Sequence, residues 1–317
     1  MKAIILGLSL MLLVACQTQP SGADTQEAGA TKAIQVANNE TASLKLTDYW
    51  YQGKAEVTSY TLSQNRYKDV HPGSAVLIFV TEDFLTDKQV KNDRYTNPHS
   101  IPILKLNMIR DFPTGLYDYH IMTSVFTPAE TDQHPYTLKV TNSTTEWCGQ
   151  VFMQLNYEKG HYKSQLFSYF EAEGDATTKV KAALLEEEIF NRIRINPQAL
   201  PVGKTKLLPS LTFVRLAHKD FEPVDAITAL SPYSGNEFEG EDLLAYQIDY
   251  PDFNRKVEIV FEKESPYAIA GWKDTYPSMF DQQLRTSIAK RKKSLMVAYW
   301  SKNSLNDMAL RAELELD

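Results

Sequence analysis

The segment EWCG around Cys148 gathers more potentially reactive side chains than any other short stretch of this sequence. A thiol becomes a nucleophile when an imidazole removes its proton, and His134 or His161 could do so if the fold brought one of them close. The apolar residues around this segment are instead typical of a core strand, with Glu146 and Cys148 on one face and Trp147 on the other. Burial without a nearby positive charge raises the pKa of a thiol. We therefore expect Cys148 to be a buried, unreactive structural residue.

Two carboxylate–imidazole pairs have the spacing of side chains on one face of a strand: Asp118 with His120, and His218 with Asp220. Each pair could supply two metal ligands or an oriented general base. The six histidines show no HxH or HxxxH spacing, and the sequence has no G-x-S-x-G, P-loop, G-x-G-x-x-G or C-x-x-C motif. We therefore predict no catalytic residue, no metal site and no cofactor, and we expect both pairs to lie on solvated sheet faces.

Aromatic and basic runs are the other candidate binding features. The run Tyr49-Trp50-Tyr51 could stack on a sugar or line a lipid pocket, although aromatic residues also fill β cores. The run from Lys290 to Lys293, which includes Arg291, could contact anionic lipid head groups. We expect this basic run to form the solvated tip of a hairpin.

The N-terminus carries a targeting pattern. A positive start at Lys2 precedes an apolar run over residues 3–14, which is too short to span a membrane. The sequence LVAC at Leu13–Cys16 resembles the lipobox of bacterial lipoproteins, in which the cysteine is lipidated and becomes the first residue. The resemblance implies a signal peptide over 1–15 and a lipid anchor on Cys16. Because Gln17 stands where an aspartate would favour the inner membrane, it also implies the outer membrane, with the body facing the periplasm.

Composition limits the remaining possibilities. Removing residues 1–15 leaves 302 residues with 32 basic and 40 acidic groups, a formal charge of −8, which argues against binding nucleic acid. Only Cys148 remains once Cys16 is lipidated, so no intramolecular disulfide can form. Residues 16–46 are polar, and no aromatic residue occurs among them, as is typical of a flexible tether. We expect a single β-rich domain over residues 47–317.

Alternating apolar residues predict that this domain is mainly β, with antiparallel sheets, in two halves over 49–173 and 211–303 that form one sheet or two. The pattern predicts a short C-terminal helix over 304–314, where Ser304 and Asp307 fit a capping box. The predicted strands are 57–62, 74–84, 101–112, 115–126, 136–142, 145–157, 161–173, 211–221, 224–230, 243–251 and 256–264, followed by a hairpin over 283–303.

One segment breaks the β pattern. Ala182, Leu185, Ile189 and Ile193 recur at helical spacing, so the sequence predicts one long central helix over 177–196, around which the sheet could wrap in an α+β arrangement. Thr177 or Thr178 could cap its start, and Asn196-Pro197 ends it.

Four stretches of the body resemble a family of uncharacterised bacterial envelope lipoproteins: YWYQGKAEVTSY, AVLIFVTEDF, EWCGQVFMQLN and LMVAYWSKNS. Some relatives carry the label septum formation inhibitor of the Maf type, but the S-x-S-x-R-R start of true Maf proteins is absent here. The resemblance implies framework strands and no catalytic residue.

Two functional classes follow. The favoured one is a non-catalytic, lipid-anchored envelope protein that binds an apolar, glycan or protein ligand with its β body. The alternative is an envelope hydrolase that uses Cys148 or a carboxylate–histidine pair.

The lipid anchor makes a direct prediction. A Cys16→Ser chain should accumulate as unprocessed precursor or soluble material, because the acyl chains that hold the protein on a membrane cannot be attached. Fractionation and palmitate labelling measure this. Unchanged membrane fractionation with normal labelling would show that the lipobox interpretation is wrong.

Overall fold

A computed structural model describes residues 46–316. The proposed signal peptide over 1–15, the proposed lipidation site Cys16 and residues 17–45 of the proposed tether lie outside the described residues. Leu46, the last residue of that tether, packs against the main hydrophobic core. Among the described residues, no helix has the length and apolar character needed to cross a membrane.

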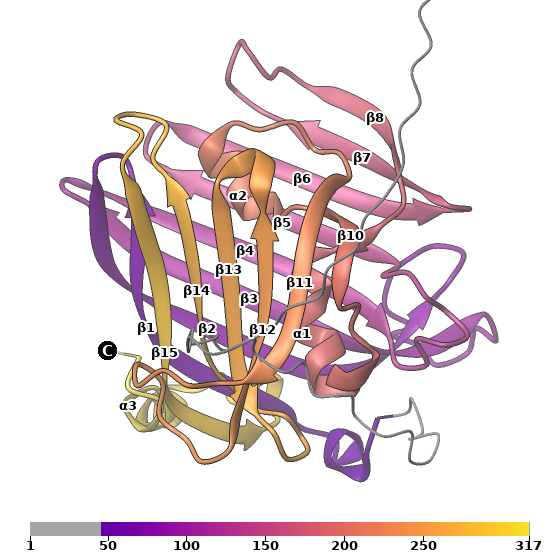
Figure 1. Cartoon of the computed structure of the whole chain (residues 1–317). Helices are drawn as coiled ribbons and strands as arrows, with labels where there is room; N and C mark the ends of the chain where they lie inside the picture. Colours follow the sequence, from indigo (N-terminus) through magenta and orange to yellow (C-terminus); the bar gives the residue numbers. More distant parts are fainter. Residues whose placement is uncertain (1–45, 317) are drawn as a thin grey trace, which may run out of the picture. The chain divides into compact units, whose positions relative to one another are not determined.

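The described chain is mainly β, as predicted, and the strands of both halves belong to one 15-stranded sheet (Figure 1). Each strand except β8 pairs with the next along the chain, β1 pairs with β15, and all pairs are antiparallel except β9 with β10. The sheet therefore has two edges, β8 and β9, which are consecutive in the sequence. The strands are β1 (Ala55–Arg66), β2 (Asp69–Leu85), β3 (Ser100–Thr114), β4 (Tyr117–Pro128), β5 (Lys139–Glu146), β6 (Gly149–Glu158), β7 (His161–Phe167), β8 (Ala176–Lys181), β9 (Leu184–Leu185), β10 (Gly203–Leu208), β11 (Val224–Pro232), β12 (Leu243–Tyr250), β13 (Arg255–Glu262), β14 (Ile269–Pro277) and β15 (Leu284–Val297).

The helices are short. Besides 3-10 turns, they are α1 (Glu186–Ile195), α2 (Leu211–Ala217) and α3 (Ala309–Glu313). The C-terminal helix is confirmed as a 3-10 turn followed by α3, and the Ser304/Asp307 capping box is present. The 3-10 turns are Asp48–Tyr51, Pro197–Ala199, Pro251–Phe253, Tyr299–Ser301 and Leu305–Met308.

The predicted central helix over 177–196 is wrong in its first half. Residues Ala176–Lys181 form β8, which pairs with β7, and no threonine caps α1, which begins at Glu186. Sheet pairing overrides local helical preference there. The predicted helical face is nevertheless correct within α1, because Ile189 and Ile193 are fully buried.

Two predicted β segments also differ. Residues Leu211–Ala217 form a helix that starts at Ser210, whose hydroxyl accepts a hydrogen bond from the Phe213 N–H. The predicted hairpin over 283–303 is one long strand, β15, with the basic run in its interior. Carboxylates make this possible, because Arg291 pairs with Glu262 while Lys292 and Lys293 lie near Glu315.

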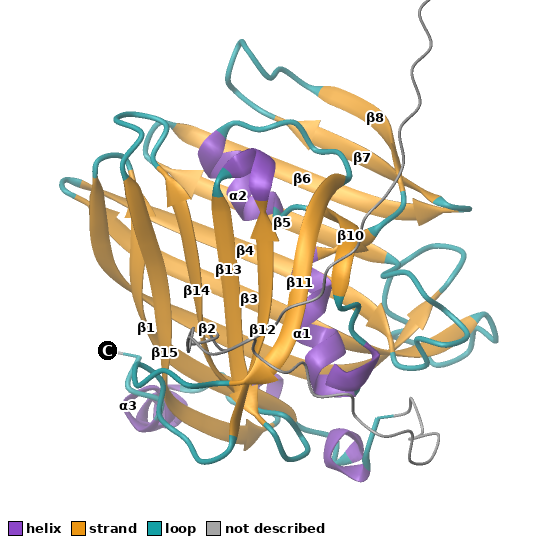
Figure 2. Ribbon diagram, viewed as in Figure 1, coloured by secondary structure: helices purple, strands orange, loops and turns teal. Residues whose placement is uncertain are grey.

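Helix α1 lies between the two halves of the sheet (Figure 2). The Asn191 amide donates to the Leu104 carbonyl in β3 and the Thr127 hydroxyl in β4. At the N-terminal end of the helix, Glu186 accepts two hydrogen bonds from Arg255 in β13, both 2.7 Å long. Side chains of both halves thus pack on α1 and form one large hydrophobic core.

A second buried ion pair ties α1 to the seam between the halves. Arg194 binds both carboxylate oxygens of Glu56 in β1, at 2.5 and 2.6 Å, and its guanidinium lies over the rings of Trp50 and Phe79. Burial alone would raise the pKa of Glu56, but the Arg194 charge together with the hydrogen bonds from Arg194 and Tyr49 outweighs burial and holds this pKa below its usual value. Trp50 and Tyr49 of the N-terminal aromatic run therefore belong to the core, where Tyr49 donates to Glu56.

Removing Arg194 should destabilise the fold strongly. An Arg194→Met chain leaves the Glu56 carboxylate buried without its partner, and we expect a loss of about 3–5 kcal/mol in the free energy of unfolding. Urea unfolding measures this loss. The control is Lys206→Met, which breaks the exposed Lys206–Asp225 pair and should cost less than about 1 kcal/mol. Similar midpoints for the two variants would contradict the structural role assigned to Arg194.

Candidate functional site

Cys148 is exposed, so the prediction of a buried core cysteine is wrong. Trp147 and Cys148 form the two-residue turn between β5 and β6, closed by the pairing of Glu146 with Gly149. One Glu146 oxygen accepts the Cys148 N–H at 2.7 Å, and the other accepts the hydroxyl of Tyr169 at 3.1 Å. The sequence gives no sign of this turn, because its residues are apolar and continue the alternating pattern of the strands on both sides.

The structure separates Cys148 from both candidate imidazoles. His161 begins β7 and therefore lies at the opposite end of β6, about 30 Å away by the rise of a strand. His134 precedes β5 and lies at that same far end. Instead of a base, Cys148 has the Glu146 carboxylate beside it, which raises the pKa of the thiol.

Neither candidate carboxylate–imidazole pair forms a contact. His120 contacts Asp111, its direct cross-strand neighbour in β3, with 2.5 Å between Nδ1 and Oδ1. His218 contacts Glu173, with 2.6 Å between Nδ1 and Oε1. Each histidine therefore contacts a carboxylate from a neighbouring strand or loop and not the aspartate two residues away in the sequence. Over residues 46–316, no cluster of three or more His, Cys, Asp or Glu side chains is arranged to hold a metal ion.

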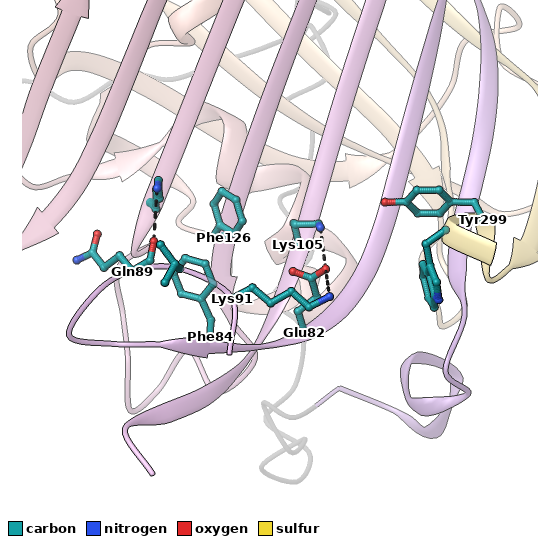
Figure 3. Close-up of a pocket in the computed structure, with 10 residues that line it drawn as sticks. Glu82, Phe84, Gln89, Lys91, Lys105, Phe126 and Tyr299 are labelled. Atoms are coloured by element: carbon teal, nitrogen blue, oxygen red, sulfur yellow. Dashed lines mark hydrogen bonds and ion pairs between the residues drawn. The ribbon is translucent and has the colours of Figure 1, made fainter. Parts of the chain in front are cut away.

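A hollow of about 480 Å³ crosses the sheet face that points away from the core, and we call it the lysine groove (Figure 3). Strand alternation produces it: Leu104, Val125 and Val140 point into the core, so their neighbours point outward. Sequence reasoning did not identify this groove. It is lined by Glu82, Phe84, Gln89, Val90, Lys91, Lys105, Phe126, Lys139, Tyr299 and Trp300.

Register aligns the centre of the groove. Lys139 in β5 lies directly opposite Phe126 in β4, which lies directly opposite Lys105 in β3. Two strand spacings separate the lysine backbones by roughly 10 Å. Beyond this row, the groove extends past Glu82 of β2 to Tyr299 (Figure 3). The half-exposed Trp300 also lines it.

The groove carries positive charge on an acidic protein. Three lysine amines face one carboxylate, whereas the whole chain has a formal charge of −7. Glu82 accepts from Lys105 at 2.8 Å and from Lys91 at 3.3 Å. Lys139 donates to the Gln89 carbonyl at 3.4 Å, and partial burial lowers the pKa of its amine. An anionic group of a ligand could therefore pair with the Lys139 amine.

Comparisons with known proteins add little. No family model matches the chain, and no curated protein does. One solved structure, described as a beta-barrel-like protein of domain of unknown function DUF1849 from Brucella abortus, is similar over 77% of this chain and 98% of its own, with 10% identity and a TM-score of 0.40. This likeness is too low to carry over a fold or a function.

The environment of Cys148 predicts a slow thiol. The rate of alkylation by iodoacetamide should rise with pH with a midpoint above that of an ordinary cysteine, because Glu146 disfavours the thiolate and raises its pKa. Glu146→Gln should lower the midpoint and speed the reaction at pH 8. Glu158→Gln, at the far end of β6, is the matched control and should change nothing. A midpoint below about 8 in the unaltered chain would contradict this assignment and favour a reactive cysteine.

Proposed function

We propose that this protein is a non-catalytic envelope protein, anchored by lipid on Cys16, whose β body binds an acidic oligosaccharide in the lysine groove. The observation that carries the proposal is the cross-strand row Lys139–Phe126–Lys105. The Lys139 amine suits a sugar carboxylate, and across the Phe126 ring the Lys105 amine, which also binds Glu82, suits a second acidic or hydroxyl group on a neighbouring sugar unit. Trp300 adds an exposed ring face on which a sugar can stack.

The position of the groove favours a glycan over a peptide. Extended peptides bind by adding a strand at a free sheet edge, where backbone groups supply hydrogen bonds. The lysine groove instead crosses β2 to β5, which are all paired on both sides. Recognition there depends on side chains alone, and amines, a carboxylate, an amide and ring faces suit hydroxyl and carboxylate groups.

The same geometry supports binding without cleavage. Glycoside hydrolysis usually needs two carboxyl groups on opposite sides of the bond that breaks. Glu82 is the one carboxylate among the residues that line the groove, and two lysines hold it. The separation of Cys148 from His134 and His161 removes the specific support for the thiol hydrolase.

Calorimetry with the purified full-length chain tests the proposal. Oligogalacturonate, an acidic oligosaccharide, should bind, and binding should weaken as salt rises. The double variant Lys105→Gln/Lys139→Gln should raise the Kd at least about tenfold, since each charged contact contributes about 1 kcal/mol or more.

Control variants separate the groove from general charge. Lys206→Gln/Lys256→Gln removes two exposed lysines elsewhere and should leave the Kd within about twofold. Trp300→Ala should weaken binding severalfold through lost stacking. Equal loss in the two double variants, or equal affinity for a neutral oligosaccharide of the same length, would refute the proposal.

A further inference from the structure

A second hollow, of about 790 Å³, lies beside the edge strand β8, and we call it the edge pocket. Residues of strands β6 to β8 line one side of it, and the C-terminal end of α2 with the residues after it lines the other. Its volume is within the range of ordinary ligand sites. The pocket is lined by Met153, Ser164, Leu166, Ala172, Glu173, Ala176, Thr178, Lys179, Val180, Lys181, Val214, Arg215, His218, Lys219, Asp220, Phe221, Glu222 and Pro223.

The floor of the edge pocket is apolar. Met153, Val180 and Val214 belong to the main hydrophobic core, and Leu166 and Phe221 pack against it. An apolar chain lying on this floor would therefore continue the core and be withdrawn from water. Each methylene buried in this way contributes about 0.8 kcal/mol.

Arg215 supplies a buried positive charge in this pocket. Its side chain is among the buried residues, at 3% exposure, and its Nε has no hydrogen-bond partner. Its guanidinium lies 4.6 Å from the ring of Phe170, and Nη1 is 3.5 Å from Nε2 of His218. Glu173, the carboxylate beside it, is bonded to His218 and to the Ser168 hydroxyl.

The buried arginines Arg194 and Arg255 show what Arg215 lacks. They are buried as deeply, and each binds a carboxylate through two nitrogens. Arg66 and Arg110 are buried without a carboxylate bond, and their partners are the Tyr119 hydroxyl with the Leu216 carbonyl and the Met108 sulfur. Among the hydrogen bonds and ion pairs of residues 46–316, none joins Arg215 to a carboxylate. A buried guanidinium stays charged, and the neighbouring Glu173 makes its hydrogen bonds to His218 and Ser168, so an anion bound beside Arg215 would give it a direct partner.

We infer that the edge pocket binds an anionic single-chain amphiphile, with its head group at Arg215 and its acyl chain along Met153, Val180 and Val214. A bare anion would leave the apolar floor exposed, and a neutral lipid would leave Arg215 unpaired. A fatty-acid carboxylate and a lysophospholipid phosphate both have the required chemistry. This second site is independent of the lysine groove and of its sugar ligand.

Photolabelling tests the inference with the full-length chain in membranes. Two probes carry a diazirine on the acyl chain: a fatty acid and a lysophosphatidic acid. At least one should label peptides of β6, β8 or α2, and the more efficient probe identifies the head group. Arg215→Met should lower labelling at least about tenfold, as expected for the loss of a charge-assisted contact, whereas Arg215→Lys should retain part of it.

A pair of adjacent substitutions gives the control that does not depend on the buried arginine. Thr178 is exposed and lines the edge pocket, whereas its exposed neighbour Thr177 does not. Thr178→Trp should fill the pocket and abolish labelling, and Thr177→Trp should label as the unaltered chain does. Equal labelling of the two tryptophan variants, undiminished labelling of Arg215→Met, or no labelling by either probe would overturn the inference.

Discussion

The fold depends on two buried ion pairs, one near each end of the short helix α1. Glu186 at the start of α1 binds Arg255 in β13, and Arg194 near its end binds Glu56 in β1. Isolated charges in this interior would cost several kcal/mol each. The two ion pairs therefore fix the rotation of α1 about its axis and its position between the two parts of the sheet. Any other arrangement would leave one of these four charges unpaired.

The same requirement accounts for three consecutive buried glutamates in the first turn of α1. Negative charge is favourable at a helix N-terminus, and each carboxylate there also meets an outside donor. Glu187 accepts from the Leu211 N–H and Glu188 from the Thr137 N–H, which connects α1 to α2 and to the segment before β5. Burial, with the neighbouring Glu186 charge, raises the pKa of Glu187 to about 7. Glu187 lies inside the core, so its raised pKa reflects packing and not a site open to ligand.

Most strands could be predicted from the sequence because alternation records which face meets the core. The failures occur where local pattern and tertiary contact disagree. Residues 177–181 fit helical spacing in the sequence, but they form a strand because they pair with β7. Trp147 and Cys148 look like core residues, yet a two-residue turn exposes them. The basic residues near Lys292 are typical of a solvated hairpin tip in the sequence. In the fold, Glu262 and Glu315 from other segments lie beside them and balance their charge.

The two candidate sites could not be predicted because neither has a local signal. The row Lys139–Phe126–Lys105 exists only through the register of three strands, and a shift of one residue would turn all three side chains toward the core. Arg215 lies in a segment whose pattern predicts a strand. Its lack of a carboxylate partner is visible only in the folded structure. Residues of the lysine groove point away from the core that α1 organises. The groove lysines therefore take no part in the ion pairs that hold α1, and the effect of their substitution on binding can be measured separately from the loss of those pairs.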